Sequence, residues 1–312
     1  MPCFHLLMGP TEELELAKVE LSALAGHVCG GRVATGPIAP DVTRSAYVRL
    51  SAEQLASGRN WAQLGAAIAR LDLRCEDYRI EVFRPGPKVS VNATRFQKSI
   101  ADLISGRPNL DDPRIQFALI VTQEMWRFGV IVSRSGQYWR SQAHRPYHCS
   151  HGLTSQMARA LVNLVAAPGD TLLDPCCGSG TVVAEALRDG IRAWGVDINP
   201  SLVGQAAANL RSLKRPANVM VGDARRIRGS FDAAVIDFPY GHSSPAESRL
   251  YAEILTNLRT QVDRMALVCG CQQSHLLGQL GLTIRQQALV TKGQLTRYIY
   301  SVSTKKGQQP WR

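Results

Sequence analysis

The chain has 312 residues, of which 45% are hydrophobic and 20% charged, and its formal net charge is +11. This length accommodates about two domains, and the composition is that of a globular protein with a hydrophobic core. No run approaches the roughly 18 apolar residues of a membrane helix, and no basic stretch marks a signal peptide. We therefore expect a cytoplasmic protein without a membrane span, whose positive charge favours a polyanionic partner.

The first 84 residues predict a small α+β unit of the ferredoxin-like kind. Apolar and alternating segments predict strands at 3–8, 47–50 and 78–83. A helix is expected over 12–24, because Thr11 can cap it and acidic residues occupy its first turn. Ser51 and Gln54 have capping-box spacing, and a second helical stretch is expected after them.

The Pro- and Gly-rich segment Arg84-Pro-Gly-Pro87 punctuates the chain and opens a second region, residues 85–145. Within it, Asn92 can cap a helix that runs to about residue 106. Two strands are expected at 116–122 and 126–133, joined by a short turn.

Residues 146–312 predict an α/β fold, a Rossmann-like doubly wound sheet, because helices and strands alternate there. The predicted helices are 154–167, 181–190, 200–213 and 245–264. The predicted parallel strands are 171–174, 192–197, 218–221, 233–238 and 265–270. Segments 283–290 and 294–303 predict a C-terminal antiparallel hairpin that closes one edge of the sheet.

The strongest motif is Asp174-Pro-Cys-Cys-Gly-Ser-Gly180, which follows an apolar strand and opens a helix. Gly178 and Gly180 allow a tight turn and close approach of a ligand. An acidic residue before the turn would repel a phosphate and suits a cation. S-adenosylmethionine, which carries a sulfonium and an amino group and no phosphate, fits this charge.

Carboxylates also end the next three strands. Asp197 stands where a ribose is held in such sheets, Asp223 can accept an adenine amine, and Asp237 opens the segment Asp237-Phe-Pro-Tyr240. Taken alone, each has a plain interpretation as a turn or cap residue. Their order at successive strand ends, where parallel sheets bind ligands, predicts one site.

These residues resemble class I S-adenosylmethionine-dependent amino-methyltransferases, in which an (N/D)PP(Y/F) motif binds an exocyclic amine. Within that class the chain is similar to the THUMP-domain tRNA guanosine N2-methyltransferases of archaea and eukaryotes. Asp237–Gly241 is similar to their DPPYG, Leu295–Tyr300 to their terminal hairpin, and Arg145–His148 to the passage from the THUMP domain into the catalytic domain. The resemblance covers about residues 145–303, and residues 60–145 resemble THUMP in element order alone.

The resemblance implies an enzyme that methylates an exocyclic base amine of RNA, most simply guanosine N2 in tRNA. The implied catalytic residues are Asp237, Phe238, Pro239 and Tyr240. The implied S-adenosylmethionine-binding residues are Asp174, Cys176, Gly178, Gly180, Asp197, Ile198, Asp223 and Ala224. Asp237 and the Phe238 carbonyl would accept the two amine N–H groups, and Tyr240 would stack on a base drawn out of its helix.

Two positions depart from the family pattern. Phe238 replaces the first proline of the motif, but its backbone carbonyl remains, so we expect activity to be retained. Cys176 and Cys177 stand where the family has one bulky residue and one cysteine, which indicates a divergent branch with its own substrate.

Candidate contacts to RNA phosphates are the basic residues Lys88, Arg95, Lys98 and Arg145, with Arg225, Arg226 and Arg228 after Asp223. The eight cysteines contain no Cys-x-x-Cys pair, so no metal site is expected. The family pattern leaves room for a small activator protein, and the oligomeric state stays open.

Alternatives remain. The same motif serves adenine N6-methyltransferases acting on DNA or rRNA, and protein glutamine methyltransferases. A non-catalytic RNA-binding protein with a decayed methyltransferase domain is the third possibility, against which the motif carboxylates and glycines are all present.

Overall fold

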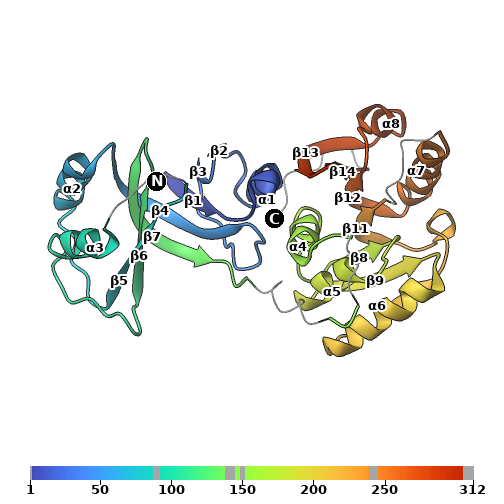
Figure 1. The fold of residues 1–312 in the computed structure, drawn as a ribbon, viewed down its shortest axis with the longest axis horizontal. Coiled ribbons are helices and arrows are strands. Elements are labelled where there is room, and N and C mark those ends of the chain that lie inside the picture. The colour runs from blue at the N-terminus through green and yellow to red at the C-terminus, as the bar shows by residue number, and fades with distance from the viewer. Residues whose placement is uncertain (1, 87–91, 138–144, 148–151, 239–244, 305–312) are drawn as a thin grey trace. The chain divides into compact units, whose positions relative to one another are not determined.

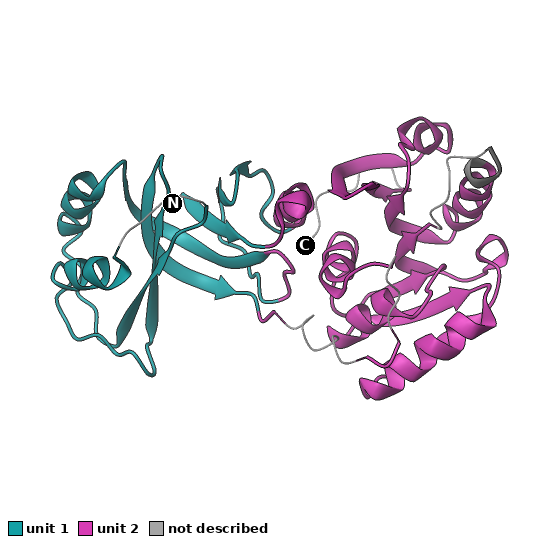
Figure 2. Cartoon of the chain, in the orientation of Figure 1, with its two compact units in different colours: residues 1–8, 24–43, 48–135 teal, residues 9–23, 44–47, 136–312 magenta. Residues whose placement is uncertain are grey.

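The computed structural model describes residues 2–86, 92–137, 145–147, 152–238 and 245–304, with backbone only for 245–248. The chain divides into two compact units, coloured separately in Figure 2. Unit 1 comprises residues 1–8, 24–43 and 48–135, and unit 2 comprises residues 9–23, 44–47 and 136–312. No boundary between these units falls at residue 84, and two N-terminal segments, residues 9–23 and 44–47, belong to unit 2.

Unit 1 is built on a seven-stranded sheet with the order β2-β3-β1-β4-β7-β6-β5 (Figure 1). Its strands are β1 (Cys3–Leu7), β2 (Cys29–Gly30), β3 (Val33–Gly36), β4 (Val48–Gly58), β5 (Tyr78–Phe83), β6 (Ile115–Val121) and β7 (Trp126–Arg134). The paired strands are antiparallel, except β5 and β6, which are parallel. The unit is therefore α+β, as predicted, but its single sheet joins the two regions that the sequence analysis separated.

Two helices, α2 (Trp61–Ala69) and α3 (Ala93–Ala101), cover one face of this sheet in Figure 1. Each begins at an asparagine, Asn60 or Asn92, whose side chain accepts the N–H three residues later, at 3.0 Å in both cases. Leu64, Ile68 and Ile100 of these helices share a buried core with sheet residues such as Phe117 and Phe128. The apolar faces of the two helices thus complete the core of unit 1.

The second predicted helix exists as α2, but Ser51 and Gln54 do not cap it, because β4 continues through both residues to Gly58. β4 pairs with β1 on one side and β7 on the other, and Ser51 Oγ lies 3.0 Å from the Nδ1 atom of buried His5. Pairing on both edges outweighs the local capping pattern, and the helix begins only at Trp61.

Unit 2 contains a second seven-stranded sheet, with the order β10-β9-β8-β11-β12-β14-β13. Its strands are β8 (Thr171–Asp174), β9 (Arg192–Asp197), β10 (Val219–Val221), β11 (Phe231–Asp237), β12 (Val262–Cys269), β13 (Thr283–Lys292) and β14 (Leu295–Ser303). Strands β8 to β12 are parallel, and the β13–β14 hairpin is antiparallel. The strand order reverses between β8 and β11. This confirms the doubly wound sheet and places a crevice at the carboxyl ends of these two strands.

The helices of unit 2 follow the predicted order. They are η1 (Thr11–Glu13), α1 (Leu14–Ala25), α4 (Ser155–Asn163), α5 (Thr181–Arg188), α6 (Pro200–Ser212), η3 (Ala224–Arg226), α7 (Pro245–Leu258) and α8 (Ser274–Gln279), α1 running on into unit 1 from residue 24. Helix α7 ends six residues before the predicted end at 264, because β12 already begins at Val262. Leu255 and Leu258 of α7 and Leu277 of α8 pack in one buried core with β11 and β12.

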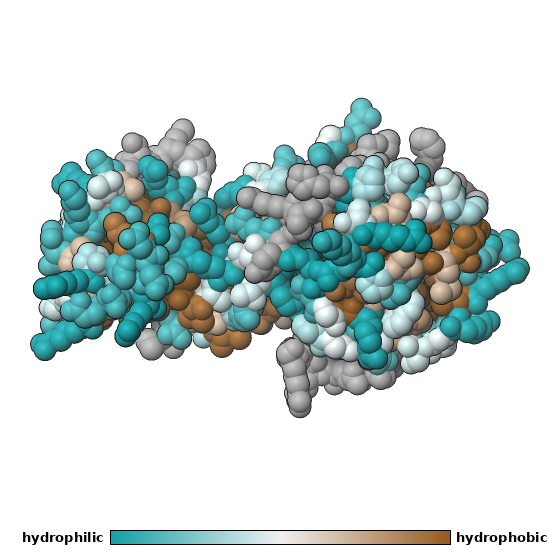
Figure 3. Space-filling view, turned by 90° about the horizontal axis from the view of Figure 1, so that it is seen from below, coloured by the Kyte–Doolittle hydropathy of each residue, from teal (hydrophilic) through white to brown (hydrophobic). Residues whose placement is uncertain are grey.

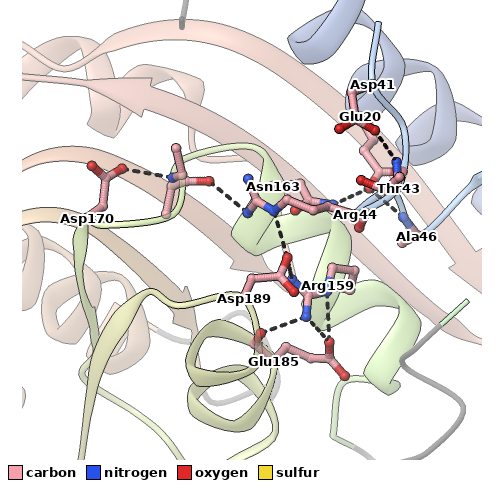
Figure 4. Close-up of polar contacts among 12 residues, drawn as sticks. Glu20, Asp41, Thr43, Arg44, Ala46, Arg159, Asn163, Asp170, Glu185 and Asp189 are labelled. Carbon is pink, nitrogen blue, oxygen red and sulfur yellow. Dashed lines mark hydrogen bonds and ion pairs between the residues drawn. The ribbon is translucent and has the colours of Figure 1, made fainter. Parts of the chain in front are cut away.

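A buried carboxylate explains why two N-terminal segments belong to unit 2 (Figure 4). Glu20 of α1 is fully buried and accepts hydrogen bonds from Ser45 Oγ (2.7 Å), the Ala46 and Tyr47 N–H groups (2.8 and 2.9 Å) and Asn163 Nδ2 of α4 (2.7 Å). Four donors satisfy the carboxylate, as a buried charge requires. The hydrogen bonds of Glu20 therefore hold residues 9–23 and 44–47 against α4.

A second buried network in Figure 4 joins α4 to α5. Arg159 is 2% exposed, donates from Nε to Glu185 Oε2 at 2.8 Å, and pairs with Asp189. Asp189 also receives Arg44 Nε at 2.6 Å. The segment around residue 44 is thus held to the same helices by an ion pair as well as by the Glu20 network.

We expect Glu20→Ala to lower the free energy of unfolding by about 3–5 kcal/mol, because four buried donors lose their acceptor. Glu15→Ala on the same helix is the matched control. Glu15 is largely exposed and pairs only with Lys18 among the described contacts, so its loss should cost less than about 1 kcal/mol. Urea unfolding measures both, and equal midpoints for the two variants would contradict the role given to Glu20.

Figure 3 shows one face of the molecule, on which hydrophilic side chains predominate and hydrophobic patches are interrupted. In the described part of the chain, no helix has the length and hydropathy needed to cross a membrane. No group of three or more His, Cys, Asp or Glu side chains among the described residues is placed to hold a metal ion.

Candidate active site

The glycine loop follows β8 and delivers the chain into α5. Gly178 (φ +48°) and Gly180 (φ +81°) both adopt left-handed conformations that other residues rarely adopt. A Cβ atom on Gly180 would lie 3.0 Å from the Cβ of Ala206 on α6, whereas one on Gly178 would point into open space. Gly180 thus allows close helix packing, and Gly178 leaves room on the side where a ligand can approach.

The two adjacent cysteines of the loop have different surroundings. The Cys177 N–H donates to the Val196 carbonyl at 2.9 Å, and a Cβ on Gly195 would come within 2.9 Å of the Cys177 Cβ. Cys177 therefore anchors the loop to β9, and Cys176 lines the cavity described below. Burial raises the pKa of both thiols far above its usual range, so both stay neutral and neither is a nucleophile near neutral pH.

Asp197 ends β9 and connects two loops. Its Oδ2 accepts the Gly178 N–H at 2.8 Å and its Oδ1 accepts the Asn199 N–H at 2.9 Å. The carboxylate is 9% exposed, and the side chain of the next residue, Ile198, is 70% exposed. A carboxylate fixed by two backbone donors keeps further lone pairs for a ligand hydroxyl, and an exposed apolar side chain beside it can cover an adenine ring.

Asp223, at the end of the third strand, is held by its own neighbour. Its carboxylate accepts Arg225 Nη2 at 2.7 Å and the Arg225 N–H at 2.9 Å, and these hydrogen bonds lower the pKa of Asp223. Ala224 is buried at the start of η3. Neither residue lines the cavity formed by the glycine loop.

Asp237 is the last residue of β11, and Phe238 follows it. The Phe238 N–H donates to the Val268 carbonyl at 3.1 Å, a bond that a proline could not make. Its ring is 1% exposed and packs on Tyr251, with ring centroids 4.2 Å apart. Phenylalanine at this position therefore serves the core of unit 2, while Pro239 and Tyr240 lie outside the described residues.

One cavity of about 330 Å³ brings the predicted residues together. Asp174, Cys176, Gly178, Asp237 and Phe238 line it, and the remainder of its wall is contributed by Gly152, Leu153, Cys177, Ser179, Thr181, Val182, Leu202 and Leu295. Asp197 contacts the cavity wall through its hydrogen bond to Gly178. The cavity opens at the carboxyl ends of β8 and β11, where the strand order reverses.

The charge of this cavity is set by carboxylates. Burial raises the pKa of Asp174 well above its usual range, and the charges of Asp237 and Asp197 raise it further, against a lowering hydrogen bond from the Cys176 N–H. Two carboxylates, Asp174 and Asp237, line the cavity, Asp197 lies directly behind Gly178, and no basic side chain is among the lining residues, so the cavity favours a cationic ligand. The sulfonium and ammonium groups of S-adenosylmethionine fit this donor set, whereas the phosphates of a dinucleotide do not.

Asn209 is a positioning residue that the sequence analysis missed. It is fully buried on α6, its Nδ2 donates to the carbonyls of Ser179 (2.9 Å) and Tyr147 (3.0 Å), and its Oδ1 accepts the Tyr147 N–H at 3.0 Å. It thereby ties Tyr147, near the start of the predicted methyltransferase domain, to the glycine loop. A polar residue on the buried stripe of α6, beside Ala206 and Leu210, was the available signal.

The predicted RNA-contacting residues differ in their exposure to solvent. Arg145 is 7% exposed and donates to Thr181 Oγ1 at 2.9 Å, which argues against a phosphate contact and for a role in fixing the start of α5. Arg95 and Lys98 are exposed on α3 of unit 1, three residues apart and so on neighbouring parts of one face. Lys88 lies outside the described residues.

The sheet order, the glycine loop and the carboxylate cavity define unit 2 as an S-adenosylmethionine-dependent methyltransferase domain of class I. Comparison with protein families agrees: residues 142–290 match the family described as UPF0020, RMKL-like, methyltransferase domain.

Individual proteins are similar over part of the chain. The tRNA (guanine(10)-N2)-dimethyltransferase of Methanothermobacter thermautotrophicus is 32% identical over 140 residues, 42% of this chain and 42% of that protein. The ribosomal protein L11 methyltransferase of Thermus thermophilus is 36% identical over 121 residues, 38% of this chain and 43% of that protein. These matches span less than half the length of either relative. The crystal structure of TrmN from Thermus thermophilus aligns with 97% of this chain and 99% of its own, with 20% identity and a TM-score of 0.49.

We expect Asp197→Ala to weaken S-adenosylmethionine binding at least about tenfold, because it removes an acceptor and releases the Gly178 N–H. Asp223→Ala is the comparison, since Arg225 already occupies that carboxylate and a smaller loss should follow. Isothermal titration calorimetry measures both affinities. Unchanged affinity in Asp197→Ala would show that the carboxylate does not take part in cofactor binding.

Proposed function

We propose that this protein transfers a methyl group from S-adenosylmethionine to the exocyclic N2 amine of a guanosine in tRNA. The observation that carries the proposal is the cavity in which Asp237 and Phe238, the first residues of the Asp-Phe-Pro-Tyr segment, face the carboxylate-lined glycine loop. The similarity to the archaeal tRNA (guanine(10)-N2)-dimethyltransferase over 140 residues supports guanosine and tRNA as the target.

The bound cofactor supplies an electrophilic methyl group on a positively charged sulfur. The protein's task is to place the weakly nucleophilic amine and to stabilise the positive charge that develops on it. The carboxylate of Asp237 and the carbonyl of Phe238 accept the two N–H groups of the amine and so fix the direction of its lone pair. Fixed acceptors in a partly dehydrated cavity provide most of the acceleration through positioning and electrostatics.

RNA rather than a protein substrate is favoured by charge and by the amine geometry. The net charge is +11, and an acceptor pair at the end of β11 suits a planar amine on a base that has left its stack. We further propose that unit 1 is a THUMP-type RNA-binding region, in which Lys88, Arg95 and Lys98 contact phosphates. A cytoplasmic location and a small activator protein belong to the same proposal.

A second candidate, adenine N6 methylation of DNA or rRNA, uses the same acceptor pair. Both amines are planar and attached to a purine, so the described cavity suits either. Incubation with labelled S-adenosylmethionine and, in separate reactions, unmodified tRNA, rRNA and duplex DNA distinguishes them, followed by nucleoside digestion and mass spectrometry. N2-methylguanosine or N2,N2-dimethylguanosine from tRNA supports the proposal, and N6-methyladenosine or its deoxy form contradicts it.

A further inference from the structure

Unit 2 carries a groove on its surface that is separate from the cofactor cavity. Helix α7 and the segment around η3 form it, with a volume of about 830 Å³. Its walls are polar apart from one glycine and one alanine, and they consist of Arg225, Arg228, Gly229, Arg249, Ala252, Glu253, Thr256, Asn257, Thr260 and Gln261. No aromatic or large aliphatic side chain lines it, so the groove does not suit an apolar ligand or a stacked base.

The groove has more positive than negative charge. Three arginines line it against a single carboxylate, Glu253, which pairs with Arg225 Nη1 at 3.2 Å and with Arg249 Nε at 2.9 Å. Arg228 Nη1 donates to two neutral oxygens, the Ile227 carbonyl and Asn257 Oδ1, both at 2.9 Å. The Arg228 guanidinium, held by neutral acceptors, keeps its charge available to an anion, and the exposed Arg249 shares the single charge of Glu253 with Arg225.

The shape of the groove favours a chain of phosphates over a single one. From Arg249 to Asn257, the lining residues of α7 cover about 12 Å of the helix axis, at 1.5 Å per residue, whereas successive phosphates of one strand of a duplex rise by about 3.4 Å. Asn257 and Gln261 donate their amide groups to carbonyls of the same wall, including that of Ile227, and so hold the segment around η3 against α7. The cations of the groove are therefore carried on a fixed surface, and phosphate contacts of this kind position a nucleic acid backbone.

The groove also adjoins the cofactor end of the site. Asp223 ends the loop after β10, and Arg225, two residues on, pairs with both Asp223 and the groove residue Glu253. The Arg225 end of the groove thus lies next to the carboxyl end of β10, and its other end lies at the start of β11, where the Phe231 N–H donates to the Gln261 carbonyl at 2.9 Å.

We propose that this groove binds the phosphodiester backbone of the RNA substrate beside the modified nucleotide, with Arg228 and Arg249 as phosphate donors. The proposal rests on the proposed function for its choice of RNA. It assigns to the methyltransferase domain an RNA contact of its own, independent of unit 1.

The test variant is R228Q/R249Q, which removes two cations and keeps two neutral side chains of similar length. The matched control is R211Q/K214Q, which makes the same change of charge at exposed positions of unit 2 outside the groove. Binding of an unmodified tRNA transcript is measured without turnover, by fluorescence anisotropy, from about 50 to 200 mM KCl, the range over which phosphate contacts are most salt-sensitive. Affinity for S-adenosylmethionine and the melting temperature report on folding.

We expect the groove variant to bind tRNA about tenfold more weakly at low salt and to lose about 1.4–1.8 from the slope of log K against log salt, the value for two phosphate contacts. Cofactor affinity and melting temperature should equal those of the wild type. Unchanged tRNA affinity and slope, or equal losses in the groove variant and the control, overturn the proposal. A wild-type protein that binds no RNA overturns it too.

This binding experiment, combined with the methylation assay described under Proposed function, separates the groove proposal from the proposed function. If groove-dependent tRNA binding is seen without methylation of guanosine, the groove assignment holds and the proposed reaction is wrong. If guanosine is methylated and the groove variant binds tRNA like the wild type, the reaction holds and the groove assignment is wrong.

Discussion

Replacing Asp237 by alanine should lower kcat for methyl transfer by more than about 100-fold, the loss typical of removing one fixed group that stabilises a developing charge. Asp237 lines the cavity together with Asp174 and Phe238, and it ends the strand next to β8. Without it, only the Phe238 carbonyl would hold the amine, which could then rotate away from the direction of attack. The Asp237 carboxylate interacts most strongly in the transition state, when positive charge develops on the amine. KM for tRNA should therefore change much less than kcat.

Asp237→Asn is the matched variant, because its amide oxygen retains one acceptor at the same position and the charge is removed. It should keep more activity than the alanine variant. Binding of S-adenosylmethionine to both, measured by calorimetry, should stay within about threefold of the wild type if the carboxylate acts on the base and not on the cofactor. Wild-type turnover by Asp237→Ala would remove Asp237 from the reaction altogether.

Replacing Asp174 by asparagine should make the ligand-free protein more stable and its cofactor binding at least about tenfold weaker, since a hydrogen bond to a charged group contributes about 1.5–3 kcal/mol. Asp174 is 2% exposed and lies with two other carboxylates, so its ionised form is costly in the absence of a cation. Asparagine has nearly the same shape, and its amide oxygen can still accept the Cys176 N–H that Asp174 Oδ1 accepts at 3.3 Å.

The pH dependence follows from the direction of the Asp174 pKa shift. Because burial raises the pKa of Asp174 in the folded state above its unfolded value, its protonated form stabilises the fold, and this stabilisation is lost as the pH rises through the folded-state pKa. Binding of a cation needs the ionised form, so the affinity of the wild type for S-adenosylmethionine should rise over the same range. Asp174→Asn should show neither dependence.

Thermal unfolding with and without cofactor, repeated over a pH series, measures both effects. A stabilisation of roughly 1 kcal/mol corresponds to an increase of about 2–4 °C in melting temperature for a domain of this size. A ligand-free Asp174→Asn protein that melts below the wild type at every pH would contradict the conclusion that the buried, ionised carboxylate destabilises the ligand-free fold. Equal cofactor affinity at alkaline pH would remove Asp174 from the cofactor site.

The sequence predicted the catalytic sheet well because its strands are buried on both faces and read as short apolar runs. Asp174, Asp197 and Asp237 each end such a run, and the rule that parallel strands bind ligands at their carboxyl ends placed them at one edge. The strands at 171–174 and 192–197 were predicted to the residue. The loop after the first contains Gly178 and Gly180, and the capping residue Asn199 follows the second.

Other features depended on contacts that no local pattern carries. Ser51 and Gln54 look like a capping box, but their segment pairs with strands at residues 3–7 and 126–134. Arg145 looks like a surface cation, but its guanidinium meets Thr181 at the start of α5. Asn209 reads as one polar residue of an amphipathic helix, and only the position of Tyr147 reveals what it holds. In each case the partner lies more than 30 residues away.

The hydrogen bond between Asn163 and Glu20 constrains the order in which parts of the chain can fold during synthesis. The two residues are 143 positions apart, so α1 emerges from the ribosome long before α4 exists to receive it. During that interval Glu20 can already accept hydrogen bonds from Ser45, Ala46 and Tyr47, but its donor on α4 is missing, and unit 1 can complete its own sheet first. A C-terminal fragment that begins at residue 146 would therefore be a poor expression target, since it lacks the first helix of its own core.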